Sequence, residues 1–359
     1  VKVNPSTPMK SVYAEIPDRH YQIIAHPAQE ELALRLVKHD PKRFTYHPTN
    51  WSKFKDGTDN IEVGGFNPVN YIRGAHVLFL ASFHNNDVTL SQFHVLNMLC
   101  ESFVETMCVI LPYWPFGTTP IDLPRDPVLS KTPQQLTSPH NFKLGTMERV
   151  VREGQVATAS TLARLFSNLP RVGKPIRVMV YDLHTLQNRF YLSGNALASL
   201  HTAIPLLINE LRSPESKISC IAFPDEGACK RFSTLFSTEF PDWPVVTCGK
   251  IRDGDRRVVT IQDGDPKDRH VIIVDDLVQT GGTLVECANA IKAAGALSVS
   301  AFVTHAVFPS GWDRFAREHG GPFDKFYITN SNPMVTNKLP HDDCFHVLDL
   351  TNIIIADLG

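Results

Sequence analysis

Two adjacent carboxylates after an apolar run mark the stretch most able to do chemistry, VIIVDDLVQTGGTL at residues 271–284. Asp275 and Asp276 repel each other at the edge of a core, and each resists losing water. The glycines of Thr280–Thr283 leave backbone N–H groups accessible where a helix is expected to begin, which predicts an anion site. Because carboxylates favour sugar hydroxyls or a metal ion instead, the pattern predicts a sugar phosphate as ligand. The alternative, a strand–turn–helix junction with Asp as the cap, needs one acid and not two.

The elements that must position this stretch alternate between short apolar strands and helices along the chain. We expect strands at 21–26, 76–83, 108–114, 176–184, 218–223, 244–248, 270–276 and 298–308, and helices at 27–39, 88–104, 157–169, 195–212, 226–237 and 282–294. This alternation predicts an α/β fold with mostly parallel sheets, in which strands are buried on both faces.

The rhythm restarts halfway along the chain, which predicts two doubly wound domains. The first covers residues 1–200 and the second covers 201–344, and we expect the segment 345–359 to pack back on the first domain. Residues 118–144 are rich in proline and polar side chains and have no period, so we expect a long insertion loop there, of the kind that is usually functional or disordered.

Composition limits the possible classes of function. A hydrophobic content of 43% and a charged content of 20% are typical of a soluble globular protein. The net charge of −2 gives no basic field for nucleic acid, and no apolar run approaches the roughly 18–20 residues of a membrane span. The seven cysteines contain no CxxC pair, which favours a reduced compartment and a cytoplasmic location. Organellar targeting by a segment lost from the N-terminus stays open.

Several stretches resemble one known family. Asp275–Thr283 resembles the 5-phosphoribosyl-1-pyrophosphate (PRPP) motif that type I phosphoribosyltransferases and PRPP synthetases share. Further stretches are similar to the synthetases alone: VYDLHTLQNRF at 180–190, AFPDEGACKRF at 222–232, TCGKIRDGD at 247–255, THAVF at 304–308 and TNSNP at 329–333. Gln279 and LPYWPFGT at 111–118 resemble the divergent plant-type synthetases, and this sequence lacks the basic adenine-binding loop of the widespread type.

This resemblance implies both a fold and a reaction. The fold is the type I phosphoribosyltransferase-like fold in each domain. The reaction is that of a ribose-phosphate diphosphokinase, which uses MgATP and ribose 5-phosphate to give PRPP and AMP. The resemblance also implies Mg²⁺ as the cofactor and a homo-oligomer, either a trimer or a hexamer.

The resemblance further implies roles for individual residues of this chain. The ribose-5-phosphate site comprises Asp275, Asp276, Gln279, Thr280, Gly281, Gly282 and Thr283; the pyrophosphate loop comprises Asp225, Gly227, Lys230 and Arg231; the catalytic pair is Lys250 and Arg252; the nucleotide site comprises Phe54, Asp56 and His184; and the metal ligands are His184 and Asp225. Lys250 and Arg252 are two positions apart on one expected strand, so their side chains point to the same face. Together they could stabilise charge on the diphosphate during its transfer.

Two other functions stay open. A type I nucleobase phosphoribosyltransferase shares the PRPP motif but usually has one domain. A non-catalytic regulatory partner of a synthetase would be expected to lose Lys250, Arg252 or His184, all of which this chain retains. Release of AMP from ATP that depends on magnesium and ribose 5-phosphate distinguishes these alternatives.

Overall fold

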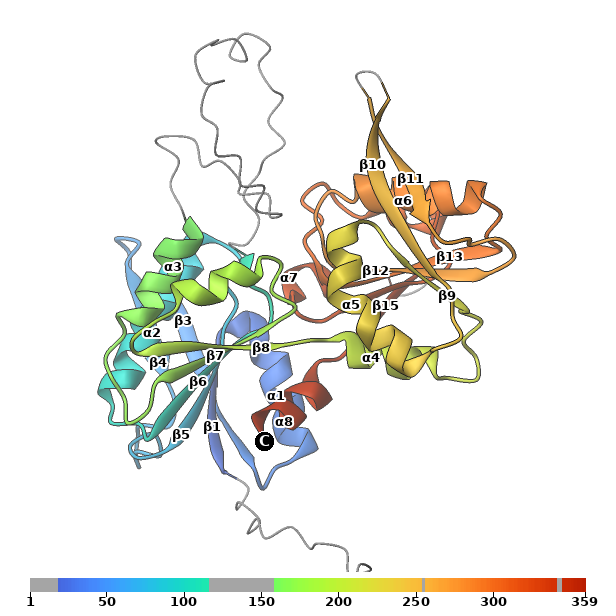
Figure 1. Ribbon diagram of the computed structural model, residues 1–359. Coiled ribbons are helices and arrows are strands. Elements are labelled where there is room, and N and C mark those ends of the chain that lie inside the picture. Colours follow the sequence, from blue (N-terminus) through green and yellow to red (C-terminus); the bar gives the residue numbers. More distant parts are fainter. Residues whose placement is uncertain (1–18, 116–157, 254–255, 341–343) are drawn as a thin grey trace, which may run out of the picture.

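Two sheets with helices packed against them make up the protein in a computed structural model (Figure 1), which describes residues 19–115, 158–253, 256–340 and 344–359. The side chains of 251–258 and the predicted insertion at 118–144 lie outside this description. The predicted α/β fold with mostly parallel sheets is confirmed. Among the helices of the described ranges, none is long and apolar enough to cross a membrane.

The first sheet is parallel throughout and has the strand order β2-β1-β5-β6-β7-β8. Its strands are β1 (Tyr21–Ala25), β2 (Phe44–His47), β5 (His76–Leu80), β6 (Thr106–Leu111), β7 (Ile176–Tyr181) and β8 (Ala196–His201). The helices that accompany it are η1 (Pro27–Gln29), α1 (Glu30–His39), α2 (Asn86–Glu101), α3 (Thr158–Ser167) and η3 (Leu186–Tyr191). A separate hairpin of β3 (Thr49–Lys53) and β4 (Asp59–Val63) lies against α2.

The second sheet has the order β11-β10-β9-β12-β13-β14-β15, and only its β10–β11 pair is antiparallel. Its strands are β9 (Cys220–Phe223), β10 (Val245–Asp253), β11 (Arg256–Asp263), β12 (His270–Val278), β13 (Ser298–Ala306), β14 (Phe326–Thr329) and β15 (Phe345–Leu348). Its helices are α4 (Ile204–Leu211), α5 (Glu226–Glu239), α6 (Gly282–Ala293), η4 (Asp313–Phe315), η5 (Arg317–His319) and α7 (Pro333–Thr336).

The helix predicted at 195–212 is wrong in its first half. Residues 196–201 form β8, which pairs in parallel with β7, and the helix α4 begins only at Ile204. Pairing at the sheet edge overrides the helix propensity of the alanines and leucines in this stretch. Pro205 then lies in the first turn of α4, a position where its missing N–H costs nothing.

The C-terminal segment also differs from the prediction. Strand β15 pairs with β14 in the second sheet, so residues 345–348 do not pack on the first. Only the last helix, α8 (Thr351–Leu358), lies beside α1 (Figure 1), where the hydroxyl group of Tyr181 donates to the Asp357 carboxylate at 2.9 Å. The open edge of β14 forms backbone hydrogen bonds with β15. The apolar face of α8 instead packs in the apolar cluster beside α1.

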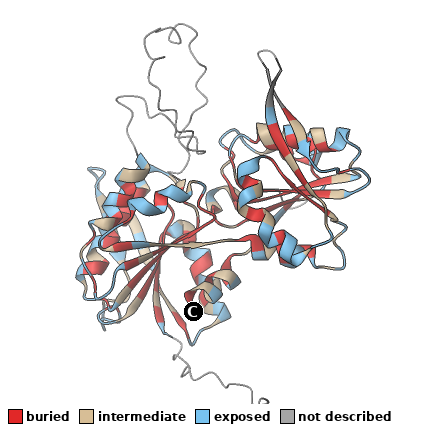
Figure 2. Ribbon diagram, in the orientation of Figure 1, coloured by how far each residue is buried: buried red, intermediate tan, exposed pale blue. Residues whose placement is uncertain are grey.

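Burial follows the strands of both sheets, and the outer faces of the helices are exposed (Figure 2). One apolar cluster joins the two halves, since Ile110 of β6, Ile204 of α4, Phe232 of α5 and Ile354 of α8 all belong to it. The two sheets therefore share an apolar core, to which α4 and α8 both contribute.

Candidate active site

Strand β12 carries the two adjacent carboxylates on its opposite faces. Residues 271–274 are fully buried between β9 and β13, as expected for a central parallel strand. The strand continues two residues beyond the predicted end, because Leu277 and Val278 still pair with β13. Since side chains alternate along a strand, Asp275 and Asp276 point to different surroundings.

Asp276 is held by an arginine and a histidine. Arg231 of α5 approaches one carboxylate oxygen at 2.5 Å, and Nδ1 of His184 lies 2.9 Å from the other. Burial alone would raise the pKa of Asp276, but the hydrogen bond and charge of His184 and the charge of Arg231 lower it below the ordinary value. The carboxyl group is therefore ionised at neutral pH, although its side chain is only 8% exposed.

Asp275 lies in the opposite electrostatic situation. Burial first, and then the neighbouring charges of Asp276 and Asp225, raise the pKa of Asp275 well above its ordinary value of 3.8. The adjacent acids are thus separated into one stabilised carboxylate and one that resists ionisation. Hydroxyl groups of a ligand would offset that resistance, because a carboxylate that accepts hydrogen bonds is stabilised in its charged form.

Asp182 joins the two halves of the molecule next to this site. It follows β7 with a φ of +37°, which a short Asp side chain tolerates better than most residues. Its buried Oδ2 accepts hydrogen bonds from the backbone N–H of Ala203 at 2.8 Å and from the hydroxyl group of Thr304 at 2.6 Å. Arg231 lies 3.7 Å from its other oxygen, so this arginine contacts acids from both sheets.

His305 completes the same interface. Its ring is buried, with Nε2 at 2.9 Å from the carbonyl oxygen of Tyr181 and Nδ1 at 2.9 Å from the Ser331 hydroxyl group. Burial lowers the pKa of His305. Thr304 and His305 were not among the predicted site residues, although the stretch THAVF that contains them was noted as similar to the synthetases.

The glycine turn after β12 has the backbone that an anion site requires. Gly281 has a φ of +73° and serves as the N-cap of α6, whose first turn contains no acidic residue. Gln279 and Thr280 are exposed, and Gly282 and Thr283 are partly buried at the start of the helix. The first N–H groups of α6 have no partner within the helix and point out from its positive end.

The predicted pyrophosphate loop lies at the start of α5. Asp225 is the N-cap of this helix, and its carboxylate accepts from the backbone N–H of Ala228 at 2.9 Å. Gly227 is exposed in the first turn. Lys230 pairs with Glu226 at 2.7 Å on the surface, with both side chains 73% exposed, so of the two predicted cations only Arg231 reaches the carboxylates of the site.

The remaining predicted residues lie on two hairpins. Lys250 is exposed on β10, and among the described residues no hydrogen bond or ion pair joins it to β12. Arg252 lies farther along the same strand, opposite Arg257, in a hairpin that extends away from the second sheet (Figure 1). Phe54 and Asp56 lie at the tip of the β3–β4 hairpin, where Asp56 accepts from the Thr58 hydroxyl group at 2.7 Å.

A metal ion bound in this site would need oxygen atoms of the substrate to complete its coordination. In the part of the chain that the structure describes, no three His, Cys, Asp or Glu side chains are grouped so that they could hold a metal ion. Mg²⁺ usually keeps several waters and binds one or two carboxylates together with substrate phosphates, so it does not require such a group. The exposed Asp225 and the ionised Asp276 are oxygen donors of the right kind.

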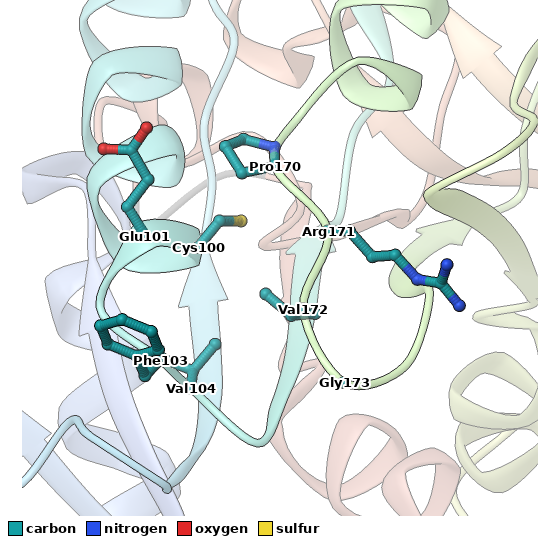
Figure 3. Close-up of a pocket in the computed structure, with 8 residues that line it drawn as sticks. All are labelled: Cys100, Glu101, Phe103, Val104, Pro170, Arg171, Val172 and Gly173. Carbon is teal, nitrogen blue, oxygen red and sulfur yellow. The ribbon is translucent and has the colours of Figure 1, made fainter.

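A pocket of about 350 Å³ lies elsewhere, at the amino end of the first sheet (Figure 3). It is lined by residues that precede β6 and β7, among them Cys100, Glu101, Phe103 and Arg171. The guanidinium group of Arg171 points away from the carboxylate of Glu101 (Figure 3). Ligands of open parallel sheets bind at the carboxyl ends of the strands, so this pocket is not the candidate site.

Comparisons with known proteins show which family this chain resembles. The model of a phosphoribosyl transferase domain matches residues 244–333. The chain is 40% identical over 331 residues to ribose-phosphate pyrophosphokinase 4 of Arabidopsis thaliana, covering 90% of this chain and 88% of that protein. It is 39% identical over 317 residues to the mitochondrial ribose-phosphate pyrophosphokinase 3 of Spinacia oleracea, covering 86% of this chain and 69% of that protein.

The fold has a counterpart among solved structures. The phosphoribosylpyrophosphate synthetase of Mycobacterium smegmatis superposes with a TM-score of 0.68, covering 94% of this chain and 97% of that chain. Its sequence identity of 19% supports the fold alone. With the extensive identity to the plant proteins, the chain belongs to the ribose-phosphate pyrophosphokinase (PRPP synthetase) family.

Proposed function

We propose that this chain is a ribose-phosphate diphosphokinase, which transfers the β,γ-diphosphate of MgATP to the 1-hydroxyl group of ribose 5-phosphate. The observation that carries the proposal is the contact of 2.9 Å between His184, which follows β7 of the first sheet, and Asp276 on β12 of the second. It brings the predicted nucleotide residue to the predicted ribose residue. A transferase with one domain would have no first sheet to supply this histidine, so the contact favours a synthetase.

The ribose end of the site follows from the chemistry of β12 and α6. Asp275 and Asp276 accept hydrogen bonds from the 2- and 3-hydroxyl groups of the sugar. The backbone N–H groups and hydroxyls of Thr280–Thr283 bind the 5-phosphate at the positive end of α6. Gln279 is exposed beside this turn, where it contacts the same ligand. This assignment is supported by the raised pKa of Asp275, which bound hydroxyl groups would lower.

The reaction needs alignment and charge neutralisation more than covalent help. The oxygen of the 1-hydroxyl group bonds to the β-phosphorus of ATP, the bond from that phosphorus to the bridging oxygen of AMP breaks, and the hydroxyl proton passes to solvent. Lys250 and Arg252 stabilise the charge on the diphosphate and on the leaving oxygen. Because both are on the hairpin β10–β11, this role requires the hairpin to close over the substrates.

Mg²⁺ is the proposed cofactor, with His184 and Asp225 as its ligands, directly or through water. When bound it neutralises charge on the phosphates. The exposed carboxylate of Asp225 supports this assignment, as does the second role of Asp225 as the cap of α5, which fixes its position. Gly227 and Lys230 follow on the first turns of α5, where they receive the pyrophosphate region.

We also propose a homo-oligomer in which the β3–β4 hairpin contacts the nucleotide of a neighbouring subunit. Phe54 is 55% exposed at the tip of that hairpin, beside Asp56. An aromatic ring presented in this way can stack on a purine base. Light scattering during size-exclusion chromatography, for the native chain and for Phe54→Ala, would give the number of subunits and separate assembly from nucleotide binding.

The test is the formation of AMP from ATP. Purified protein is mixed with MgATP and ribose 5-phosphate, and AMP is followed with each substrate omitted in turn. We expect AMP only with both substrates. Lys250→Ala should lower kcat about 10²-fold or more with little change in KM, because its charge meets the transition state. Lys217→Ala, which removes an exposed lysine outside the site, is the matched control and should retain activity.

Other outcomes would replace the proposal. Binding of ribose 5-phosphate without AMP formation would indicate the regulatory partner. Formation of a nucleotide from PRPP and a free nucleobase would indicate the phosphoribosyltransferase. AMP formation that Lys250→Ala leaves unchanged would retain the reaction but remove the proposed role of the hairpin.

A further inference from the structure

A short helical turn, η4 (Asp313–Phe315), lies directly against the glycine turn of the proposed ribose-5-phosphate site. A Cβ atom placed on Gly281 would be 2.0 Å from Cζ of Phe315, so the backbone of the turn rests on that ring. Phe315 is fully buried, and its ring centroid lies 4.8 Å from that of Phe308. The ring therefore fixes η4 relative to the start of α6.

The residue before this ring is an arginine whose charge lies at the same place. A Cβ atom placed on Gly282, the first residue of α6, would be 4.0 Å from Nη1 of Arg314. The side chain of Arg314 is exposed, and among the described residues it makes no hydrogen bond or ion pair that would neutralise its charge. Its guanidinium group thus lies over the amino end of α6.

This placement concentrates positive charge. The amino end of a helix carries a partial positive charge, which acids usually balance. Helix α5 has Asp225 as its cap and Glu226 in its first turn, whereas α6 has a glycine cap and no acid in its first turn. The charge of Arg314 is repelled by the partial positive charge at the amino end of α6 in the free protein. A bound anion with two negative charges would attract both and so offset this repulsion.

We infer that Arg314 binds the 5-phosphate of ribose 5-phosphate, opposite the backbone N–H groups of α6. The planar fork of a guanidinium group can donate two parallel hydrogen bonds to phosphate oxygens, which adds geometric selectivity for an oxyanion over a hydroxyl group. This inference rests on the proposed function, since it takes the sugar phosphate as the ligand of the turn. Arg314 lies outside all stretches that the sequence singled out.

The experiment measures the binding of ribose 5-phosphate by calorimetry without ATP, using the full chain and three variants. Arg314→Ala should weaken the binding of ribose 5-phosphate at least tenfold. Arg314→Lys should recover part of this loss of affinity, because lysine restores the charge without the planar fork. Arg317→Ala is the matched control: it removes a nearby exposed arginine that pairs with Asp324 at 3.2 Å, and it should bind as the native chain does.

Kinetics provide a second readout that a structural role would not give. Arg314→Ala should raise KM for ribose 5-phosphate at least tenfold and leave both KM for ATP and the melting temperature unchanged. The inference would be overturned if Arg314→Ala bound ribose 5-phosphate as the native chain does, or if Arg317→Ala lost the same affinity. It would also be overturned if Arg314→Ala raised KM for ATP as much as KM for ribose 5-phosphate.

The two proposals can fail separately. If the native chain binds ribose 5-phosphate through Arg314 but forms no AMP, the diphosphokinase fails and the inference stands. If AMP forms and Arg314→Ala has native kinetics and binding, the inference fails and the diphosphokinase stands.

Discussion

Asp275 and Asp276 are neighbours in the chain, yet the fold gives their carboxyl groups opposite proton affinities. Asp276 turns toward His184 and Arg231, and its pKa is lowered even though burial opposes this. Asp275 turns away from those partners, and burial and the adjacent acid raise its pKa. Such a raised pKa is what we expect of a residue that serves the proposed ligand and not stability.

Asp275→Asn should therefore stabilise the free protein while it weakens the binding of ribose 5-phosphate. A raised pKa in the folded state means that the stability of the native chain is fully present below about 3.8, the unfolded value, and is lost as the pH rises toward the folded pKa. The free energy of unfolding of Asp275→Asn should exceed that of the native chain at pH 8, and the difference should shrink toward pH 4. Affinity for ribose 5-phosphate should fall about tenfold to hundredfold.

Urea unfolding at the two pH values measures this, and Asp276→Asn is the contrasting variant. The lowered pKa of Asp276 means that its contribution to stability is present above about 3.8 and is lost as the pH falls through the folded value. Asp276→Asn should accordingly be less stable than the native chain at neutral pH. A loss of stability in Asp275→Asn at pH 8 would contradict this account of the two acids.

At the scale of elements, the junction between β12 and α6 combines a backbone requirement with a packing requirement. Gly281 adopts the left-handed region with a φ of +73°, and its Cα faces the ring of Phe315 with no space for a Cβ atom. The same contact sets the place of η4. A change at this one position should therefore disturb both the proposed anion site and the helical turn η4 beside it.

Gly281→Ala should lower the free energy of unfolding by more than backbone strain alone does. Gly320→Ala is the control that measures the strain by itself. Gly320 has a similar φ of +80°, but nothing lies within 4 Å of a Cβ atom there. We expect Gly320→Ala to lower the free energy of unfolding by about 1–2 kcal/mol. Gly281→Ala should lower it further, because the Phe315 ring must also move, and should weaken ribose 5-phosphate. If chemical denaturation showed the same loss of unfolding free energy for both variants, the Phe315 ring would move aside at no cost.

At the scale of the whole molecule, the two sheets are joined by a shared apolar cluster and by buried polar contacts. Asp182 follows β7 of the first sheet, and Thr304 lies on β13 of the second. Their hydrogen bond of 2.6 Å joins the same two sheets as the contact of His184 with Asp276, so it helps to fix the distance between the proposed nucleotide and ribose sides. The alignment of two substrates in the proposed reaction depends on that distance.

A double-mutant cycle with Asp182→Ala and Thr304→Val should measure this coupling. The left-handed backbone of Asp182 adds strain to the alanine variant, but that strain is present in both arms of the cycle and cancels. We expect a coupling energy of about 1–3 kcal/mol in urea unfolding, since both groups are buried. A value near zero would mean that this hydrogen bond does not help to hold the two sheets together.

The sequence by itself determined the class of fold and the residue pattern of the proposed ribose site. Apolar runs such as residues 271–274 predict buried parallel strands, and the neighbouring acids and glycines predict the ligand, because both patterns depend only on residues close in the chain. The predicted helix at 195–212 failed where pairing with β7 outweighed local propensity. The assignment of 345–348 to the first domain failed because a sheet edge accepted the strand.

Only the tertiary structure decided which distant residues meet. His184 lies 92 positions before Asp276, and Asp182 lies 122 positions before Thr304, so no local pattern links them. The order of the strands and the packing of α5 place Arg231 between the acids of the two sheets and leave Lys230 in solvent. Arg314 lies near the amino end of α6 because the buried ring beside it packs against Gly281, which is a property of the folded core and not of any motif.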